Sequence, residues 1–139
     1  MTLAADIEAK VRASFARQSL MQTFDAELLL LDEGRVQISA PVTGSVLQQH
    51  GVAHAGLTFA LGDTAAGYAA LTMIEGAADV MTAEIKINLL RPASGERLVA
   101  EGRVLKPGRR LIVVQADVFA ENGDGHTHVA VMQGTMVPA

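Results

Sequence analysis

Residues 54–74 read HAGLTFALGDTAAGYAALTMI, and this stretch decides the fold. Alanine and leucine dominate it, so we predict one long helix over its length. Three glycines lie within it, although glycine inside a helix costs about 1 kcal/mol relative to alanine. They are Gly56, Gly62 and Gly67. Because small residues let a helix lie tightly against a sheet, we predict that this helix packs on one.

One carboxylate interrupts this apolar stretch. Asp63 is its only formally charged side chain, and His54 and Tyr68 are its only other titratable groups. A carboxylate among Ala, Leu, Phe and Gly loses much of its water, so it must be hydrogen-bonded or used in chemistry. Asp63 is therefore either a catalytic carboxylate or the N-cap of a second helix that follows a break at Gly62. The residues alone do not decide between the two.

His54, Ala55 and Gly56 are expected at the start of the helix. There the first backbone N–H groups have no partner within the helix and carry partial positive charge, which suits a developing oxyanion. Gly56 has no side chain to obstruct a close approach. We interpret His54 as a side chain that caps or supports the loop, in preference to a catalytic histidine.

The helix start and Asp63 are too far apart to serve one reaction within one chain. A helix rises about 1.5 Å per residue, which separates Ala55 from Asp63 by about 12 Å along the axis. One helix therefore cannot present both an oxyanion donor and a carboxylate to the same carbonyl group. A two-fold dimer that brings Ala55 of one protomer near Asp63 of the other removes this difficulty.

Shorter elements are predicted on both sides of the long helix. Residues 3–16 have apolar positions at helical spacing, with Thr2 as an N-cap. Residues 24–40 form a predicted hairpin whose second strand ends at Pro41. In residues 84–89 apolar and polar residues alternate, which predicts a strand. Three more extended runs, separated by turn residues, cover residues 97–105, 111–120 and 127–137. This order predicts an α+β domain with a long helix on an antiparallel sheet of about six strands.

Composition narrows the class of protein. The chain has 139 residues, half of them hydrophobic, which fits a single domain over residues 1–139. Its net charge of −4 and the lack of a basic stripe argue against nucleic acid as a partner. With no cysteine, it has no disulfide, thiolate metal site or Cys nucleophile. The N-terminus lacks the features of a signal peptide and no stretch resembles a membrane span, so we expect a cytoplasmic protein.

Several motifs resemble one known family. Residues 48–56, QQHGVAHAG, followed by residues 61–67, LGDTAAG, resemble the hotdog-fold thioesterases of the phenylacetate-degradation (PaaI) type, in the 4-hydroxybenzoyl-CoA thioesterase-like superfamily. Residues 85–93, IKINLLRPA, resemble the strand that follows the hotdog helix. Residues 102–110, GRVLKPGRR, and 133–135, QGT, match its closing hairpin and last strand. The order and spacing of these motifs make the resemblance specific.

The resemblance extends over roughly residues 20–137 and implies both a fold and a reaction. The fold is a hotdog, in which a curved antiparallel sheet wraps the long helix, with residues 1–19 forming a short helix before the core. Protomers of this family pair into dimers, and we expect a homodimer that assembles into a homotetramer, with the active site at the dimer interface. The implied reaction is hydrolysis of aryl- or medium-chain acyl-CoA to free acid and CoA. Coenzyme A enters as part of the substrate, and no metal or separate cofactor is implied.

The resemblance assigns catalytic roles to four residues. Asp63 falls on the acidic residue that acts as general base or nucleophile. Ala55 falls on the residue whose backbone N–H polarises the thioester carbonyl. Gln48 falls on a position that orients substrate or water, typically from the protomer opposite Asp63. Thr82 lies about where some members place a Ser or Thr that holds the attacking water.

Four further residues are candidates for substrate binding. His54 and Gly56 flank Ala55, where the family commonly has His-Gly-Gly; the extra methyl group of Ala55 leaves its N–H intact and bears on substrate size. Arg91 and Arg109 are candidates for contacts with the CoA phosphates. For any single basic residue, the simpler interpretation is an ordinary surface charge in contact with solvent.

Two other functions fit the same fold. A non-catalytic acyl-CoA-binding domain would leave a lone carboxylate in an apolar helix as an unexplained cost. A hydratase or dehydratase of this fold uses a histidine with an acidic partner, and the sequence has no His-Phe-Pro-Gly loop of the kind expected in acyl-carrier dehydratases. We therefore predict an acyl-CoA thioesterase, with these two as alternatives.

Overall fold

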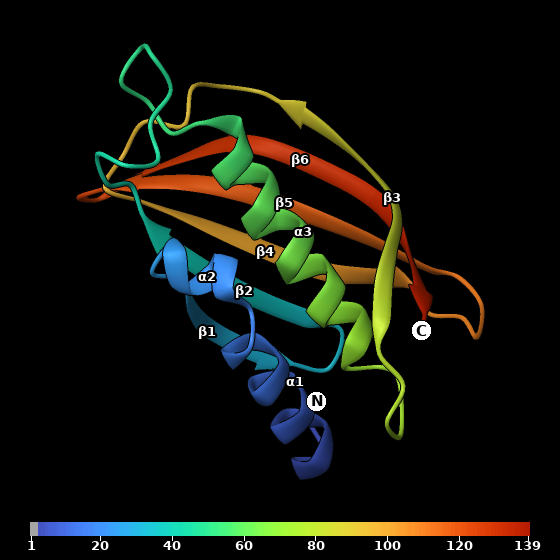
Figure 1. Cartoon of the computed structure of the whole chain (residues 1–139). Helices are drawn as coiled ribbons and strands as arrows, with labels where there is room; N and C mark the ends of the chain where they lie inside the picture. Colours follow the sequence, from blue (N-terminus) through green and yellow to red (C-terminus); the bar gives the residue numbers. More distant parts are fainter. Residues whose placement is uncertain (1–2) are drawn as a thin grey trace.

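A long helix lies across one face of a curved antiparallel sheet (Figure 1). The structure, a computed structural model, describes residues 3–139. The long helix is α3, Ala55–Leu71. The six strands within these residues are β1 Glu27–Asp32, β2 Arg35–Pro41, β3 Val80–Leu89, β4 Arg97–Lys106, β5 Ile112–Asn122 and β6 Gly125–Pro138. They form one sheet in the order β1-β2-β4-β5-β6-β3, and every pair is antiparallel. The predicted α+β architecture is confirmed.

α3 packs closely on the sheet at two glycines, one in the helix and one in β4. A Cβ at Gly62 of α3 would overlap the sulfur of Met132, and a Cβ at Gly102 of β4 would overlap the backbone of Ala65. Carbon atoms in contact normally stay about 3.5–4.0 Å apart. Small aliphatic side chains and methionines from α3 and the inner face of the sheet fill the core around these contacts. The predicted close packing of the glycine-containing helix is confirmed.

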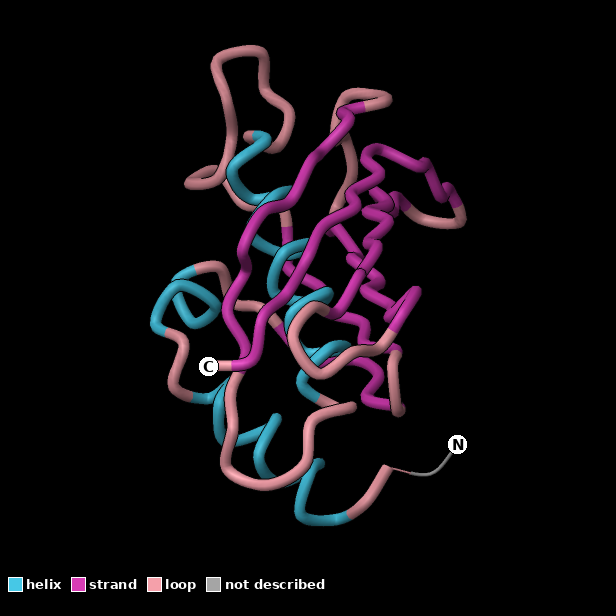
Figure 2. The backbone as a smooth tube through the Cα atoms, turned by 90° about the vertical axis from the view of Figure 1, so that its right-hand side faces the viewer, coloured by secondary structure: helices cyan, strands magenta, loops and turns pink. Residues whose placement is uncertain are grey.

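The N-terminal segment forms two helices beside α3 (Figures 1 and 2). Helix α1, Ala5–Ala16, starts two residues later than predicted, with Ala4 at the N-cap position and no side-chain cap. The predicted N-cap, Thr2, lies outside the described residues. Helix α2, Ser19–Thr23, was not predicted because its five residues are too few for a periodic pattern. No helix within residues 3–139 is long and apolar enough to cross a membrane.

Lys10 attaches α1 to the loop that follows α3. Its ammonium group donates to three backbone carbonyl oxygens at 2.9, 3.0 and 3.2 Å, those of Ile74, Gly76 and Ala78. Because these carbonyls lie just beyond the C-terminus of α3, α1 is held beside the second half of that helix.

β3 lies at one edge of the sheet and pairs with β6 alone. It begins at Val80, four residues before the predicted start. Most of its side chains are exposed, including Met81 at 64% and Leu89 at 57%. An exposed ten-residue edge strand with apolar side chains is a surface that proteins usually cover.

Candidate active site

Asp63 lies in the interior of α3 and is half-buried. The helix is continuous through Gly62, so the alternative that Asp63 caps a second helix is wrong. Gly62 does not break the helix because its missing side chain makes room for Met132. Thr82 of β3 donates its hydroxyl hydrogen bond to Asp63 Oδ1 at 2.7 Å. The structure therefore brings together two of the four predicted catalytic residues.

A cavity of about 250 Å³ lies beside Asp63, between α1, α3 and β3. We call it the Asp63 pocket. Its lining residues are Ser14, Gln18, Asp63, Thr64, Gly67, Tyr68, Asp79, Val80, Thr82 and Met136. The contribution of α1 was missed from the sequence, because the helical pattern of residues 3–16 does not indicate where that helix lies.

His54 is the N-cap of α3, as the sequence predicted. Its Nδ1 accepts a hydrogen bond from the backbone N–H of Gly56 at 2.7 Å. A Cβ at Gly56 would lie 2.9 Å from that nitrogen, so the cap requires glycine at this position. The N–H of Gly56 is thereby occupied, whereas the N–H of Ala55 has no hydrogen-bond partner within residues 3–139. Ala55 therefore supplies the open donor at the helix start.

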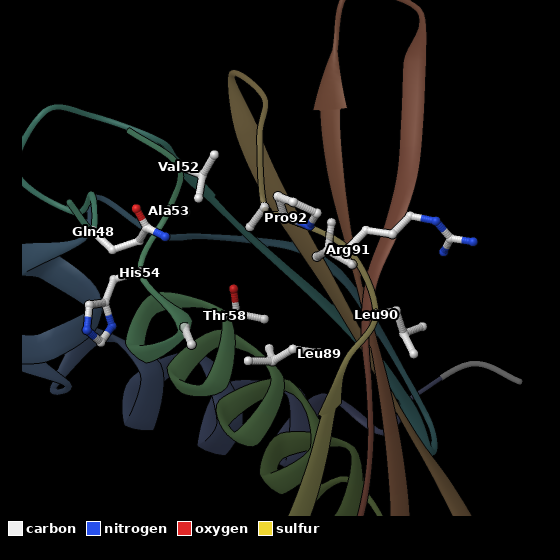
Figure 3. A pocket seen from close by; sticks show the side chains of 12 residues that line it. Gln48, Val52, Ala53, His54, Thr58, Leu89, Leu90, Arg91 and Pro92 are labelled. Atoms are coloured by element: carbon white, nitrogen blue, oxygen red, sulfur yellow. The ribbon is translucent and has the colours of Figure 1, made fainter. Parts of the chain in front are cut away.

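A larger cavity, of about 480 Å³, opens at the start of α3 (Figure 3). We call it the helix-start pocket. It is lined by Gln48, Val52, Ala53, His54, Ala55, Thr58, Leu89, Leu90, Arg91, Pro92, Ala93 and Val129. Four of the predicted site residues are therefore gathered here, while Thr58 and the apolar residues on either side of Arg91 were missed.

Gln48 is held by its own loop. Its side-chain oxygen accepts the backbone N–H of His50, and its backbone N–H donates to the Val52 carbonyl at 2.9 Å. These contacts fix the amide group beside the helix-start pocket, where a polar group can orient a ligand.

Asp63 does not border the helix-start pocket, and Ala55 does not border the Asp63 pocket. Both residues belong to the continuous helix α3, so they are separated by about 12 Å along its axis. Within one chain the carboxylate of Asp63 and the open N–H of Ala55 therefore lie at two separate pockets.

The two predicted CoA-binding arginines lie at opposite ends of the protomer. Arg91 borders the helix-start pocket and donates from Nη1 to the His128 carbonyl at 3.0 Å. Arg109 is exposed in the β4–β5 turn, at the end of the sheet where Val80 pairs with Pro138. Within one protomer they do not form a single phosphate site.

Known proteins share both sequence and structure with this chain. The profile of the thioesterase superfamily matches residues 50–125. The crystal structure of a thioesterase family protein from Silicibacter pomeroyi is similar at 41% identity, with a TM-score of 0.93 over 95% of this chain and 97% of that one. The acyl-coenzyme A thioesterase PaaI of Escherichia coli K12 is 29% identical over 107 residues, which is 76% of this chain and 74% of that protein. The structure of E. coli PaaI, 22% identical, shares the fold with a TM-score of 0.87 over 99% of this chain and 96% of that one.

This chain belongs to the thioesterase superfamily, whose profile covers more than half of it. The predicted class, an enzyme that hydrolyses thioesters, is confirmed. It shares the hotdog fold of E. coli PaaI and is similar in sequence to that thioesterase, the resemblance that the motifs around His54 and Asp63 indicated.

Proposed function

We propose that this protein hydrolyses acyl-CoA thioesters to the free acid and CoA, with Asp63 as the reacting carboxylate. The main support for this role is the hydrogen bond that Thr82 donates to Asp63 Oδ1 at the border of a cavity. Asp63 Oδ2 has no hydrogen-bond partner within residues 3–139, so one carboxylate oxygen is held and the other is open. A carboxylate oriented in this way suits attack on a carbonyl or activation of water.

The complete site is proposed to form between two protomers through β3. A two-fold axis near the middle of this edge strand pairs its Val80 end with the Leu89 end of a second copy. The Asp63 pocket borders the first end, at Val80 and Thr82, and the helix-start pocket borders the second, at Leu89. Such pairing brings the Asp63 pocket of one protomer to the helix-start pocket of the other. It also covers the exposed side chains of Met81 and Leu89.

The reaction follows from this arrangement. The Ala55 N–H of one protomer donates to the thioester carbonyl oxygen, on which negative charge develops. Asp63 of the other protomer removes a proton from water as the water oxygen bonds to the carbonyl carbon, or attacks that carbon itself before water releases the acid. Gln48 and Thr82 orient the water and the carboxylate. The C–S bond then breaks, and CoA leaves as the thiol after its sulfur takes up the proton that water releases in the reaction.

The helix-start pocket is proposed to receive the pantetheine end of the substrate. Its wall combines apolar side chains from Leu89 to Ala93 with the polar groups of Gln48 and Thr58, as expected of a ligand site. Two-fold pairing brings the Arg109 end of one protomer toward the Arg91 end of the other, so that both can serve the CoA phosphates. We further propose that the active dimers assemble into homotetramers.

A thiol-release assay tests the proposed function. Wild-type protein and the Asp63→Asn variant are incubated with a panel of arylacyl- and alkanoyl-CoA esters, and free CoA is followed with a thiol reagent. The chain has no cysteine, so it contributes no background. We expect thiol release by the wild type and a loss of at least about 1000-fold in the variant.

Three outcomes contradict the proposal in different ways. Equal rates for wild type and Asp63→Asn would remove Asp63 from the reaction. Tight ester binding without thiol release by the wild type would support the non-catalytic binding domain. An enoyl-CoA that gains water while its thioester stays intact would support a hydratase.

A further inference from the structure

The loop between α3 and β3 joins the two elements that carry the proposed catalytic pair, Asp63 and Thr82. It consists of residues 73–79, after the C-cap of α3 and before the first residue of β3. In the part of the chain that the structure describes, Lys10 is the only residue that makes hydrogen bonds with residues 75–78. The position of this loop therefore depends on a side chain from α1.

Three carbonyl oxygens of the loop surround the Lys10 ammonium group. They belong to Ile74, Gly76 and Ala78, at 2.9, 3.0 and 3.2 Å, and we call them the carbonyl cradle. An ammonium group has three N–H donors and no acceptor, so the cradle matches it donor for acceptor. Such a site, made only of carbonyl oxygens, is built for a cation.

Gly76 provides the turn that lets these carbonyls meet at one point. Alternate carbonyls of an extended strand point the same way without converging, so the chain has to turn between them. Gly76 has a φ of 75°, in the left-handed region that glycine adopts without strain. Nothing lies within 4 Å of a Cβ placed there, so packing does not require the glycine. The conformation of the cradle does.

α1, which carries Lys10, is itself docked on α3. Gln18 Nε2 donates to the Tyr68 hydroxyl at 2.7 Å, and Ser14 Oγ shares a hydrogen bond with the same hydroxyl at 3.0 Å. The ring of Phe15 meets that of Tyr68 edge to face, with the ring centroids 6.2 Å apart. The hydrogen bonds of Lys10 therefore fix the loop relative to α3.

Thr82 needs a fixed loop because the remainder of β3 does not hold it. A bulge between Thr82 and Glu84 interrupts the pairing of β3 with β6. Because a bulge leaves a residue unpaired and bends the strand, the pairing beyond it does not by itself fix the direction of Thr82. Residues 80–82 are held by the end of β6 and by two backbone hydrogen bonds between Asp79 and Ala139, at 3.0 and 2.8 Å. Asp79 directly follows the last carbonyl of the cradle.

We infer that Lys10 is a positioning residue of the active site: its ammonium group in the carbonyl cradle holds the start of β3 so that Thr82 meets Asp63. The effect on rate rests on the proposed function, in which Thr82 orients Asp63 for reaction. Lys10 touches no reacting atom and acts through Thr82. The cradle should accept a free ammonium ion when the lysine side chain is removed, because that ion has the same kind of donors.

A double-mutant cycle tests the positioning role. Lys10→Met keeps most of the side-chain length and removes its charge and donors. It should lower kcat by about three- to tenfold, within the loss expected without the Thr82 hydroxyl, and change KM by less than about twofold. In the Thr82→Val background the same substitution should change kcat by less than about 1.5-fold, since nothing is left to position. Arg12→Ala, which removes an exposed cation of α1 paired with Glu8, is the matched control and should leave kcat unchanged.

Free cations test the carbonyl cradle. Lys10→Ala leaves space for an ion, so ammonium chloride should raise kcat of this variant several-fold and should not raise that of the wild type. It should also raise the melting temperature of the variant, because a ligand that binds only the folded state stabilises it. Tetramethylammonium chloride at the same concentration has no N–H donor and should do neither.

Gly76→Val tests the cradle while Lys10 stays in place. A β-branched residue is strained at a φ of 75°, so the turn should open and kcat should fall as it does in Lys10→Met. Gly123→Val places the same residue at a φ of 59° in the β5–β6 turn, also with nothing within 4 Å, and should leave kcat unchanged. If Lys10→Met does not fold, Gly76→Val takes its place in the cycle with Thr82→Val.

Hydrogen exchange separates this inference from the proposed function. Without substrate, the backbone amides of residues 79–82 should exchange at least about tenfold faster in Lys10→Ala than in the wild type, and ammonium should slow them again. If the wild type releases no thiol from any ester, the proposed hydrolysis fails. The exchange rates then still decide whether Lys10 holds the start of β3.

Three results would overturn the inference. The first is an equal loss of kcat from Lys10→Met in the wild-type and Thr82→Val backgrounds, which would indicate a general effect on the fold. The second is an exchange rate in residues 79–82 that Lys10→Ala leaves unchanged. The third is an equal response of Lys10→Ala to ammonium and tetramethylammonium.

Discussion

Thr82 and Asp63 form the contact on which the proposed chemistry depends. The two residues are 19 positions apart, and the bond joins the edge strand β3 to the middle of α3. A hydroxyl that holds one carboxylate oxygen fixes the rotation of the whole group. The second oxygen is then oriented before the substrate reacts. Ordering the carboxylate therefore adds no entropic cost to the reaction step.

Removing that hydroxyl should slow the reaction. A hydrogen bond to a charged group is worth about 1.5–3 kcal/mol, so Thr82→Val should lower kcat/KM by about 10- to 100-fold. Thr82→Ser keeps the hydroxyl and should recover most of the rate. Thr127→Val, at an exposed strand threonine, is the matched control. Steady-state kinetics check the prediction, and a wild-type rate in Thr82→Val would contradict it.

His54 should act through its cap and not through proton transfer. His54→Ala removes the acceptor for the Gly56 N–H and should cost about 0.5–2 kcal/mol of stability. His54→Asn supplies a new oxygen acceptor at the N-cap, so it should restore most of the lost stability and activity. Denaturant unfolding and kcat/KM are measured on both variants. Equal loss of activity in the two, with stability restored only by Asn, would indicate a role for the imidazole in the chemistry.

The sequence reveals some of these residues better than others. Asp63 and Ala55 could be selected because a charge in an apolar run and a helix start are visible in the sequence itself. Thr82 could be placed only by its resemblance to a family, because its contact depends on how β3 crosses α3. Thr58 and Tyr68 were missed as site residues, since a polar residue in a helix gives no indication of the face on which a cavity lies.

At the scale of elements, the contact between α3 and β4 should be the least tolerant of added volume. Gly102→Ala places a methyl group against the backbone at Ala65, which cannot move as a side chain can. We expect a loss of about 3 kcal/mol or more in the free energy of unfolding. Gly44→Ala, where nothing lies within 4 Å, should change stability by less than about 0.5 kcal/mol. Denaturant unfolding measures both, and equal effects would contradict the close approach.

The predicted elements agree with the structure where the sequence pattern is set by a buried face. Strands β4, β5 and β6 alternate between core and surface, and their predicted bounds differ from the observed ones by at most two residues. The start of β3 was missed because residues 80–84 alternate little between apolar and polar, and most of them are exposed at the sheet edge. Alternation of apolar and polar residues reflects the burial of one face of a strand. It therefore does not reveal a strand whose two faces are both exposed.

At the scale of the whole molecule, a shared site predicts that two inactive variants can rescue each other. Asp63→Asn removes the carboxylate, and Ala55→Pro removes the open N–H. Proline is tolerated at the first position of a helix, and His54 has the extended backbone that should precede it, with φ −63° and ψ 141°. Each variant alone should be inactive. After mixing and subunit exchange, half of the dimers are mixed and each has one intact site, so activity should return to about a quarter of the wild-type value.

The mixing experiment needs two controls. Size-exclusion chromatography with light scattering should show dimers or tetramers for both variants, so that a lack of rescue is not due to a lack of assembly. Carrying both substitutions on one chain and mixing it with wild type should give no rescue beyond the wild-type contribution. Absence of rescue between assembled, exchanging variants would contradict a site that spans protomers.

The overall topology could be predicted only in part. Tight turns between β1 and β2 and along β4, β5 and β6 imply neighbouring antiparallel strands. The pairing of β2 with β4, and the place of β3 at the far edge, depend on contacts between segments that α3 separates. No local pattern specifies such pairings, so they were not predicted.

The attachment of α1 has a consequence for how such an enzyme changes over evolution. The first helix supplies Ser14 to the Asp63 pocket, yet it carries none of the proposed catalytic groups, and Lys10 ties it to backbone carbonyls that any sequence provides. Its side chains other than Lys10 can therefore drift, or be grafted from a relative, without disturbing Asp63 and Thr82. One wall of the Asp63 pocket and the proposed catalytic groups are then carried on separate segments, so that the first can change over evolution while the second is kept.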